Sequence, residues 1–66
     1  MMDKNDLKLQ WKELKDKVQN QWDKISEQDF SEIKGDKDKL IETVQEKYNK
    51  TKEKAKKEVD SWLDNL

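Results

Sequence analysis

The chain has 66 residues, 47% of them charged, and its 15 lysines and 16 acidic residues leave a net charge of −1. This length allows one domain at most, and the balanced charge argues against a chain held open by self-repulsion. The absence of Cys and His excludes disulfides, thiol chemistry and any catalysis or metal binding that depends on histidine. No apolar run of about 20 residues is present to span a bilayer.

The first predicted element is a long amphipathic helix. Placed about 100° apart around a helix axis, six large apolar residues share an arc of about 80°; they are Leu7, Trp11, Leu14, Val18, Trp22 and Ile25. This stripe predicts one buried face on a helix from about Asp6 to Ile25, capped by Asn5 or Asp6. Leu9 falls on the opposite side, and we expect it to be exposed.

A short helix is predicted next. Ser26 to Asp29 has the Ser-x-x-acid form of a capping box, which marks a helix start. Phe30 and Ile33 follow at a spacing of three and share one face of this helix. Gly35 is expected to end it, because Gly adopts the left-handed conformation without penalty.

Two further amphipathic helices complete the chain. The third is capped by Asp36 or Asp38, and Asn49 is expected to end it. The fourth begins after Thr51 and continues to the end of the chain. The predicted core positions of these two helices are Leu40, Ile41, Val44, Tyr48, Ala55, Val59, Trp62, Leu63 and Leu66.

These stripes predict an all-α fold. Because no stripe can be buried alone, three amphipathic helices and one short helix are expected to pack as a small four-helix bundle. We expect one domain over residues 1–66, with residues 1–5 frayed. The acid-first pairs Glu13–Lys17 and Glu53–Lys57 stand at a spacing that supports a helix locally.

Enzymatic chemistry finds little support in the sequence. The Ser and Thr residues have no His to activate them, and a single Gly cannot form a phosphate-cradling loop. Asp36-Lys37-Asp38 begins like a calcium loop, but Ile41 and Lys47 stand where that loop requires Gly and Glu. A chain of this size also leaves little room for a pocket of several hundred Å³. We therefore expect no catalytic residue, cofactor, metal site or small-molecule substrate.

The clearest charge feature is a basic segment over residues 47–57. Six lysines opposed by Glu53 give it a charge of +5; they are Lys47, Lys50, Lys52, Lys54, Lys56 and Lys57. One interpretation is an electrostatic surface for nucleic acid, another anionic surface or a protein partner. The other is a solvated helix beside acidic neighbours. The second is favoured, because the chain has no Arg and these lysines would not all face one way.

The three tryptophans also allow more than one interpretation. Aromatic rings stack on single-stranded bases, and a Trp face on the first helix would suit a membrane surface. Trp11, Trp22 and Trp62 all lie on the apolar stripes, however. Packing in the core is therefore the favoured interpretation.

The order and spacing of residues also indicate a family. The pattern begins with Trp11-Lys12, Leu14-Lys15, Lys17-Val18, Gln21-Trp22 and Lys24-Ile25, continues through Gly35, Leu40-Ile41, Gln45-Glu46, Tyr48 and Ala55, and ends with Lys57-Glu58-Val59 and Trp62. It resembles the bacterial CsbD-like stress-response proteins, in their Trp-containing branch. The resemblance implies a cytoplasmic protein of the general stress response, without known catalytic residues. It also implies two helical hairpins crossing at a steep angle, like a SAM-type domain.

The chain departs from this family at four positions where Gly is common, which hold Asp16, Asp23, Thr43 and Asn49. Three of them fall within predicted helices, where the loss of Gly favours the helix. Asn49 still tolerates a turn conformation. The departures therefore leave both the predicted fold and the resemblance intact.

Three functional hypotheses follow. The first is a small, soluble, monomeric protein that accumulates under stress and is not an enzyme. The second is a binding module that uses residues 47–57 on nucleic acid or another protein. The third is a chain that stays disordered until it is dried or bound.

Overall fold

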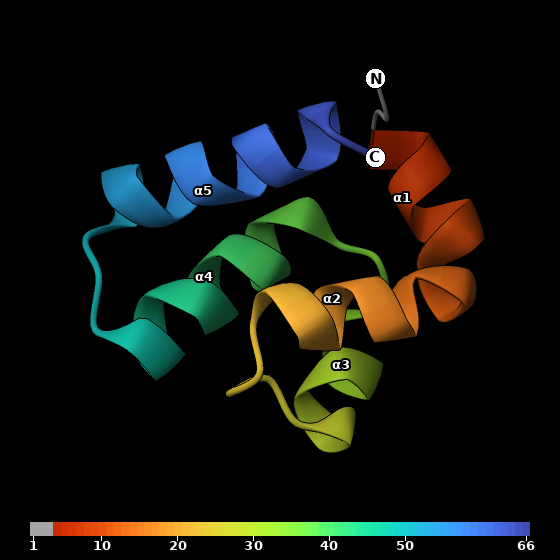
Figure 1. Cartoon of the computed structure of the whole chain (residues 1–66), viewed down its shortest axis with the longest axis horizontal. Coiled ribbons are helices and arrows are strands. Elements are labelled where there is room, and N and C mark those ends of the chain that lie inside the picture. The colour runs from red at the N-terminus through yellow and green to blue at the C-terminus, as the bar shows by residue number, and fades with distance from the viewer. Residues whose placement is uncertain (1–3) are drawn as a thin grey trace.

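The computed structural model describes the backbone of residues 4–66 and the side chains from Asp6 onward. The predicted fraying of residues 1–5 falls largely outside this part. The described elements are α1 (Lys4–Gln10), the 3-10 helix η1 (Trp11–Leu14), α2 (Lys15–Gln21), α3 (Glu27–Ile33), α4 (Lys37–Tyr48) and α5 (Lys52–Asp64). Figure 1 shows them as a small all-helical bundle, and residues 4–66 contain no strand. The predicted fold class is confirmed.

A single core cluster unites these helices. Its members are Leu7, Trp11, Leu14, Val18, Trp22, Ile25, Phe30, Ile33, Leu40, Ile41, Val44, Ala55, Val59, Trp62 and Leu63. Tyr48 and Leu66 pack against it while partly buried. Every residue assigned to a stripe therefore contributes to the core, and Leu9 is exposed as expected, at 84%.

The first helix differs from the prediction in its path. It is already helical at Lys4, so neither Asn5 nor Asp6 is an N-cap, and it is interrupted by η1 before α2 begins. Figure 1 shows the chain bending there, so that α1 does not continue the line of α2. The predicted straight helix over 6–25 is therefore wrong, although its buried face is right.

The interruption coincides with a contact to α3. The indole N–H of Trp11 donates a 2.9 Å hydrogen bond to the backbone carbonyl of Phe30. The two rings also stack, with centroids 4.4 Å apart and planes 11° from parallel. A 3-10 turn is wound more tightly than an α-helix, and here it keeps Trp11 and Leu14 buried while α1 turns away. A contact across 19 residues cannot be inferred from a local helical pattern.

The end of the first helix was also predicted wrongly. Helix α2 stops at Gln21, and Trp22 takes a non-helical conformation with φ −131° and ψ 86°. The N–H of Ile25 donates to the carbonyl of Trp22 at 3.0 Å, which closes a turn. Both side chains are 1% exposed. The turn returns them to the core, where Trp22 meets Trp62 edge to face at 5.1 Å.

Side-chain caps start α3 and α4, as predicted. The N–H of Asp29 donates to Ser26 Oγ and the N–H of Ser26 donates to Asp29 Oδ2, both at 3.2 Å, which completes the capping box. For α4 the cap is Asp36 rather than Asp38. Its Oδ1 accepts from the N–H groups of Asp38 and Lys39 at 3.0 and 3.4 Å.

Gly35 has two roles, of which the sequence predicted one. Lys34 and Gly35 have φ angles of +52° and +76°, so both residues adopt the left-handed conformation that ends α3. A Cβ atom at Gly35 would also stand 2.6 Å from the Cα of Lys8. The missing side chain therefore allows the backbone of α1 to lie directly against this turn.

Of the two helical hairpins that the resemblance implied, the one formed by α4 and α5 is clear in the structure. In its loop, Asn49 adopts a positive φ of +52°. Thr51 caps α5, because its Oγ1 accepts a hydrogen bond from the N–H of Lys54 at 3.2 Å. Helices α2 and α3 are consecutive across residues 22–26, and the ion pair between Lys15 Nζ and Glu27 Oε1 links them at 2.5 Å. The caps at Asn49 and Thr51 are as predicted.

Candidate basic surface

The six lysines of the basic segment come from three parts of the hairpin. Lys47 lies in the last turn of α4, Lys50 lies in the loop, and the other four lie in the first two turns of α5. Their surroundings differ sharply. Two are engaged by acidic side chains of the protein itself, and four are not.

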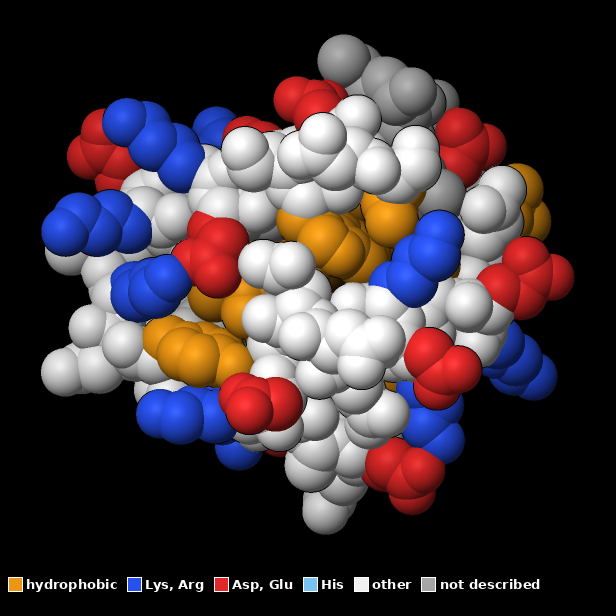
Figure 2. Space-filling model, viewed as in Figure 1, with side chains coloured by type: hydrophobic (Ala, Val, Ile, Leu, Met, Phe, Trp, Pro, Cys, Tyr) orange, Lys and Arg blue, Asp and Glu red, His pale blue; other side chains and the backbone are white. Residues whose placement is uncertain are grey.

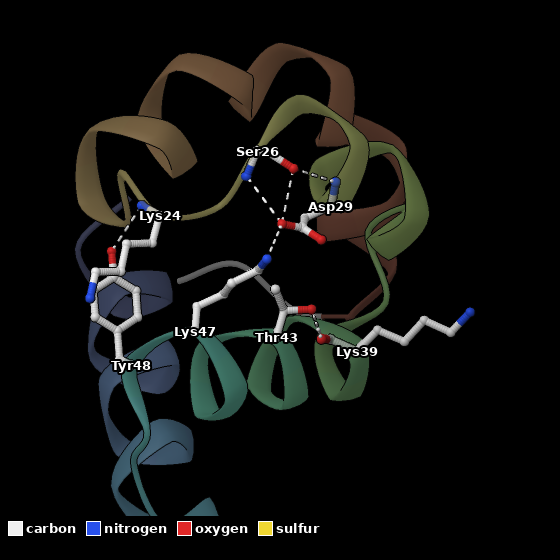
Figure 3. A network of polar contacts seen from close by, with 7 residues as sticks. All are labelled: Lys24, Ser26, Asp29, Lys39, Thr43, Lys47 and Tyr48. Carbon is white, nitrogen blue, oxygen red and sulfur yellow. Dashed lines mark hydrogen bonds and ion pairs between the residues drawn. The ribbon is translucent and has the colours of Figure 1, made fainter.

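Lys47 is engaged by α3. Its Nζ lies 3.0 Å from Asp29 Oδ2, an oxygen that also accepts from the backbone N–H and the hydroxyl of Ser26 (Figure 3). The hydrogen bond from Lys47 holds the pKa of Asp29 below its usual value. Lys47 therefore links α4 to the start of α3 through this ion pair, and it is not free to bind an external anion.

Lys50 is engaged by α5. Its Nζ forms an ion pair with Glu58, and the other oxygen of that carboxylate accepts from the indole N–H of Trp22 at 2.9 Å. The hydrogen bond from Lys50 is the main cause that lowers the pKa of Glu58, while partial burial opposes it. This link connects the loop, α5 and the turn after α2. Lys50 is therefore structural as well.

The remaining four lysines form a smaller candidate surface, here called the α5 lysine group: Lys52, Lys54, Lys56 and Lys57. All four are exposed, and none forms an ion pair within residues 6–66. Lys54 and Lys57 are three apart and share one side of the helix, whereas Lys52 and Lys56 are four apart and share another. The positive end of the helix dipole lies at the same end of α5, so an anion there meets two sources of positive potential.

Sequence reasoning missed a polar cluster around Tyr48. The phenol oxygen of Tyr48 accepts from the backbone N–H of Lys24 and donates to Asp23 Oδ1, each at 3.2 Å. The Nζ atoms of Lys24 and Lys50 lie 5.1 and 5.8 Å from the ring centroid, within the range of cation–π attraction. Figure 3 shows Lys24 lying across this ring. The spacing of Tyr48 revealed its apolar face, but nothing in the sequence indicated its polar partners.

The surface also has larger depressions than we expected, because the small size of the chain suggested little room for a pocket. An open depression of about 440 Å³ lies between α3 and α4. Another, of about 460 Å³, lies beside α1 and η1. Among the described residues, no group of three His, Cys, Asp or Glu side chains is arranged to hold a metal ion. No helix in this part of the chain is long and apolar enough to cross a membrane.

Comparison with known proteins places the chain among relatives of similar length. It is 43% identical over 61 residues to the UPF0337 protein YjbJ of Escherichia coli O6:H1, which covers 92% of this chain and 88% of that protein. The chain belongs to the UPF0337 family. A UPF0337 protein of Pectobacterium atrosepticum is 40% identical over 63 residues, and one of Protochlamydia amoebophila is 33% identical over the same length; each match covers 96% of this chain and 91% of the relative.

UPF0337 is a CsbD-like family, as the resemblance of the residues indicated. The names of these bacterial UPF0337 relatives state no activity, ligand or partner. No family model matches the chain, and no solved structure matches it either.

Proposed function

We propose that this UPF0337 protein is a cytoplasmic, soluble, monomeric stress-response protein of the Trp-containing CsbD-like branch, and that its 66 residues form one domain that acts without catalysis. The observation that carries the proposal is the division between interior and surface. All three tryptophans are used in the core, and no polar residue is buried among those described. The charged side chains are thereby left to the exterior.

Figure 2 supports this division for the face that it shows. Charged side chains, together with backbone and side chains that are not hydrophobic, cover most of it, and hydrophobic side chains appear in separate small patches. An exterior with both signs of charge and no broad apolar area favours solubility. Such a surface suits a protein that accumulates to high levels when water is scarce, because it helps to keep crowded copies in solution.

A deletion strain tests the physiological part of this proposal. Survival is measured after osmotic, oxidative and acid stress, with the wild-type gene and a Trp22→Ala gene as complementing copies. We expect reduced survival under at least one stress, rescue by the wild type, and poor rescue by the core variant because it fails to fold. Equal survival of the deleted and parent strains under all three stresses would refute it.

A second candidate function is nucleic-acid binding by the α5 lysine group. The observation that favours it is that these four lysines are exposed and have no acidic partner within the described residues. Lysines that neutralise phosphates release counterions, and binding then weakens steeply with salt. Four such contacts correspond to a slope of about −3 in log K against log salt on single strands.

Titration of labelled DNA and RNA at two salt concentrations tests this second function. Replacing Lys52, Lys54, Lys56 and Lys57 by Gln is expected to abolish the salt-dependent binding. The matched control replaces four other exposed lysines by Gln: Lys12, Lys17, Lys34 and Lys39. An equal loss in both variants would indicate a general charge effect, and absence of binding at low salt would exclude the function.

A further inference from the structure

The most exposed large apolar side chain in the described part of the protein lies in a basic setting. Leu9 of α1 is 84% exposed. It lines the depression of about 460 Å³ together with Lys8, Lys12 and Lys34, and Trp11, Glu13 and Ser31 line it as well. We call Lys8, Leu9 and Lys12 the Leu9 face. An exposed Leu between lysines is suited to a surface that offers both an apolar contact and negative charge.

A surface of that kind occurs on the same molecule. The depression of about 440 Å³ between α3 and α4 is lined by three glutamates: Glu32, Glu42 and Glu46. We call these three residues the Glu groove. Ile33 and Thr43 also line it and add apolar surface, and the two lysines Lys34 and Lys39 line it as well. Lys34 lines both depressions, so the two surfaces adjoin at the end of α3.

The charged side chains that define both surfaces take no part in the ion pairs that stabilise the fold. The ion pairs formed within residues 6–66 use other side chains, joining Lys15 to Glu27, Lys37 to Asp60, Lys47 to Asp29 and Lys50 to Glu58. Within that part of the chain, the lysines of the Leu9 face and the glutamates of the Glu groove form no ion pair. The molecule therefore presents two adjoining surfaces, one with lysines and one with glutamates that form no ion pair within this part of the chain.

We propose that the Leu9 face of one copy docks into the Glu groove of a second copy. Lys8 and Lys12 would then meet Glu42 and Glu46 around an inserted Leu9. We place this contact head-to-tail, so that each copy uses one surface on each neighbour; one free surface is then left at each end, and assembly continues beyond a dimer. One apolar anchor with an exposed charged rim makes a weak contact. The proposed contact therefore leaves the chain monomeric when dilute and lets it associate when concentrated.

A second copy fits these observations better than an anionic bilayer does. A bilayer would engage Lys8 and Lys12, but a single Leu offers little area to insert. It would also leave the three glutamates of the Glu groove unpaired. A second copy engages both sets of unpaired charge.

Sedimentation equilibrium tests the proposal on the wild-type chain. Over protein concentrations from about 0.02 to about 2 mM, the range in which weak contacts form, the weight-average mass should rise from 8.0 kDa to more than twice that value. Added salt should suppress the rise, because it screens exposed charges. A mass that stays at 8.0 kDa at the highest concentration in low salt overturns the proposal.

Two complementary variants test the head-to-tail geometry. Leu9→Asp disables the Leu9 face and keeps the Glu groove, whereas Glu42→Lys with Glu46→Lys does the opposite. Each variant alone should remain monomeric. A mixture of the two should form a 1:1 pair and grow no further, because each partner retains one working surface. A mixture that stays monomeric overturns the proposal.

Matched controls carry the same charge changes elsewhere. Asn20→Asp matches Leu9→Asp, and Asp16→Lys with Glu53→Lys matches the double variant; all three sites are exposed and lie outside both surfaces. These controls should associate as the wild type does, and all variants should keep its helical circular dichroism. If Leu9→Asp still associates, the Leu9 face does not form the contact and the proposal is overturned. Leu9-dependent binding of a monomeric chain to anionic phosphatidylglycerol vesicles would also overturn the proposal.

Discussion

The α4–α5 hairpin and the first 26 residues are specified in different ways. In the hairpin, each boundary has a local signal: Asp36 caps α4, Asn49 ends it in the left-handed conformation, and Thr51 caps α5. In residues 4–26, by contrast, the bend at η1 and the end of α2 both coincide with contacts to distant parts of the chain. Trp11 bonds and stacks with Phe30, and Trp22 donates to Glu58.

The difference explains which predictions held. Apolar spacing identified buried residues in both regions, because burial depends on which side chains avoid water. The boundaries of the helices were predicted well only where capping and turn residues lie next to them in the sequence. In the first region, the core residues Trp22 and Ile25 lie in a turn, which a helical stripe cannot distinguish from one more helical turn. The comparison predicts that a substitution in the core removes more helix from residues 4–26 than from the α4–α5 hairpin.

The largest expected effect is from Trp22→Ala. This side chain is 1% exposed and packs against Trp62, so its removal should cost about 3–5 kcal/mol. A domain of this size has a total stability of about 3–10 kcal/mol. Urea unfolding should therefore show that at least about a third of the parent's stability is lost, and a domain near the lower end of this range is unfolded without denaturant. A melting temperature within a few degrees of the parent would show that Trp22 does not belong to the core.

The next effect concerns the close approach of α1 to the end of α3. Gly35→Ala introduces a Cβ at a φ of +76° and at 2.6 Å from the Cα of Lys8, which should cost about 2–4 kcal/mol. The control is Lys34→Gly at the neighbouring left-handed residue, which should change stability by less than about 1 kcal/mol. A loss of only about 1 kcal/mol in Gly35→Ala, which the left-handed conformation alone accounts for, would mean that the approach of α1 adds nothing to the cost.

A smaller effect is expected in the locally specified hairpin. Thr51→Ala removes the side chain that accepts from the N–H of Lys54 and should cost about 1 kcal/mol. Thermal unfolding should show a fall of about 4–8 °C for a domain of this size. Thr51→Ser keeps the hydroxyl and should retain most of the stability. If Thr51→Ser loses as much as Thr51→Ala, the cap is not the cause.

The smallest effect is the dependence of stability on pH. The pKa of Glu58 is lowered from its usual 4.5, chiefly by Lys50, so the folded state favours the charged form. This contribution is fully present above pH 4.5 and is lost as the pH falls through the lowered value. Glu58→Gln should therefore flatten the stability profile on the acid side. Glu42→Gln is the control, and an equal flattening in both variants would contradict the role of the Glu58–Lys50 pair.

The candidate surface was predictable only in part. The sequence identified all six lysines by composition, and the structure leaves four of them unpaired. The engagement of Lys47 and Lys50 depends on Asp29 and Glu58, which the fold brings near. The sequence instead suggested the local pairs Glu13–Lys17 and Glu53–Lys57, neither of which is among the ion pairs within residues 6–66. Linear spacing shows where the charges are, but the packing of the helices decides which of them meet.

The most direct test measures residual helix, residue by residue, in Trp22→Ala. Backbone ¹³Cα shifts of the variant are compared with those of the wild type over residues 4–21, 37–48 and 52–64. We predict that α4 and α5 keep measurable helical shifts, because their signals are local, while residues 4–21 fall to values of an unfolded chain. Short isolated helices are marginal in water, so the retained helix will be partial. An equal loss in all three segments, or more helix left in residues 4–21, would contradict the account.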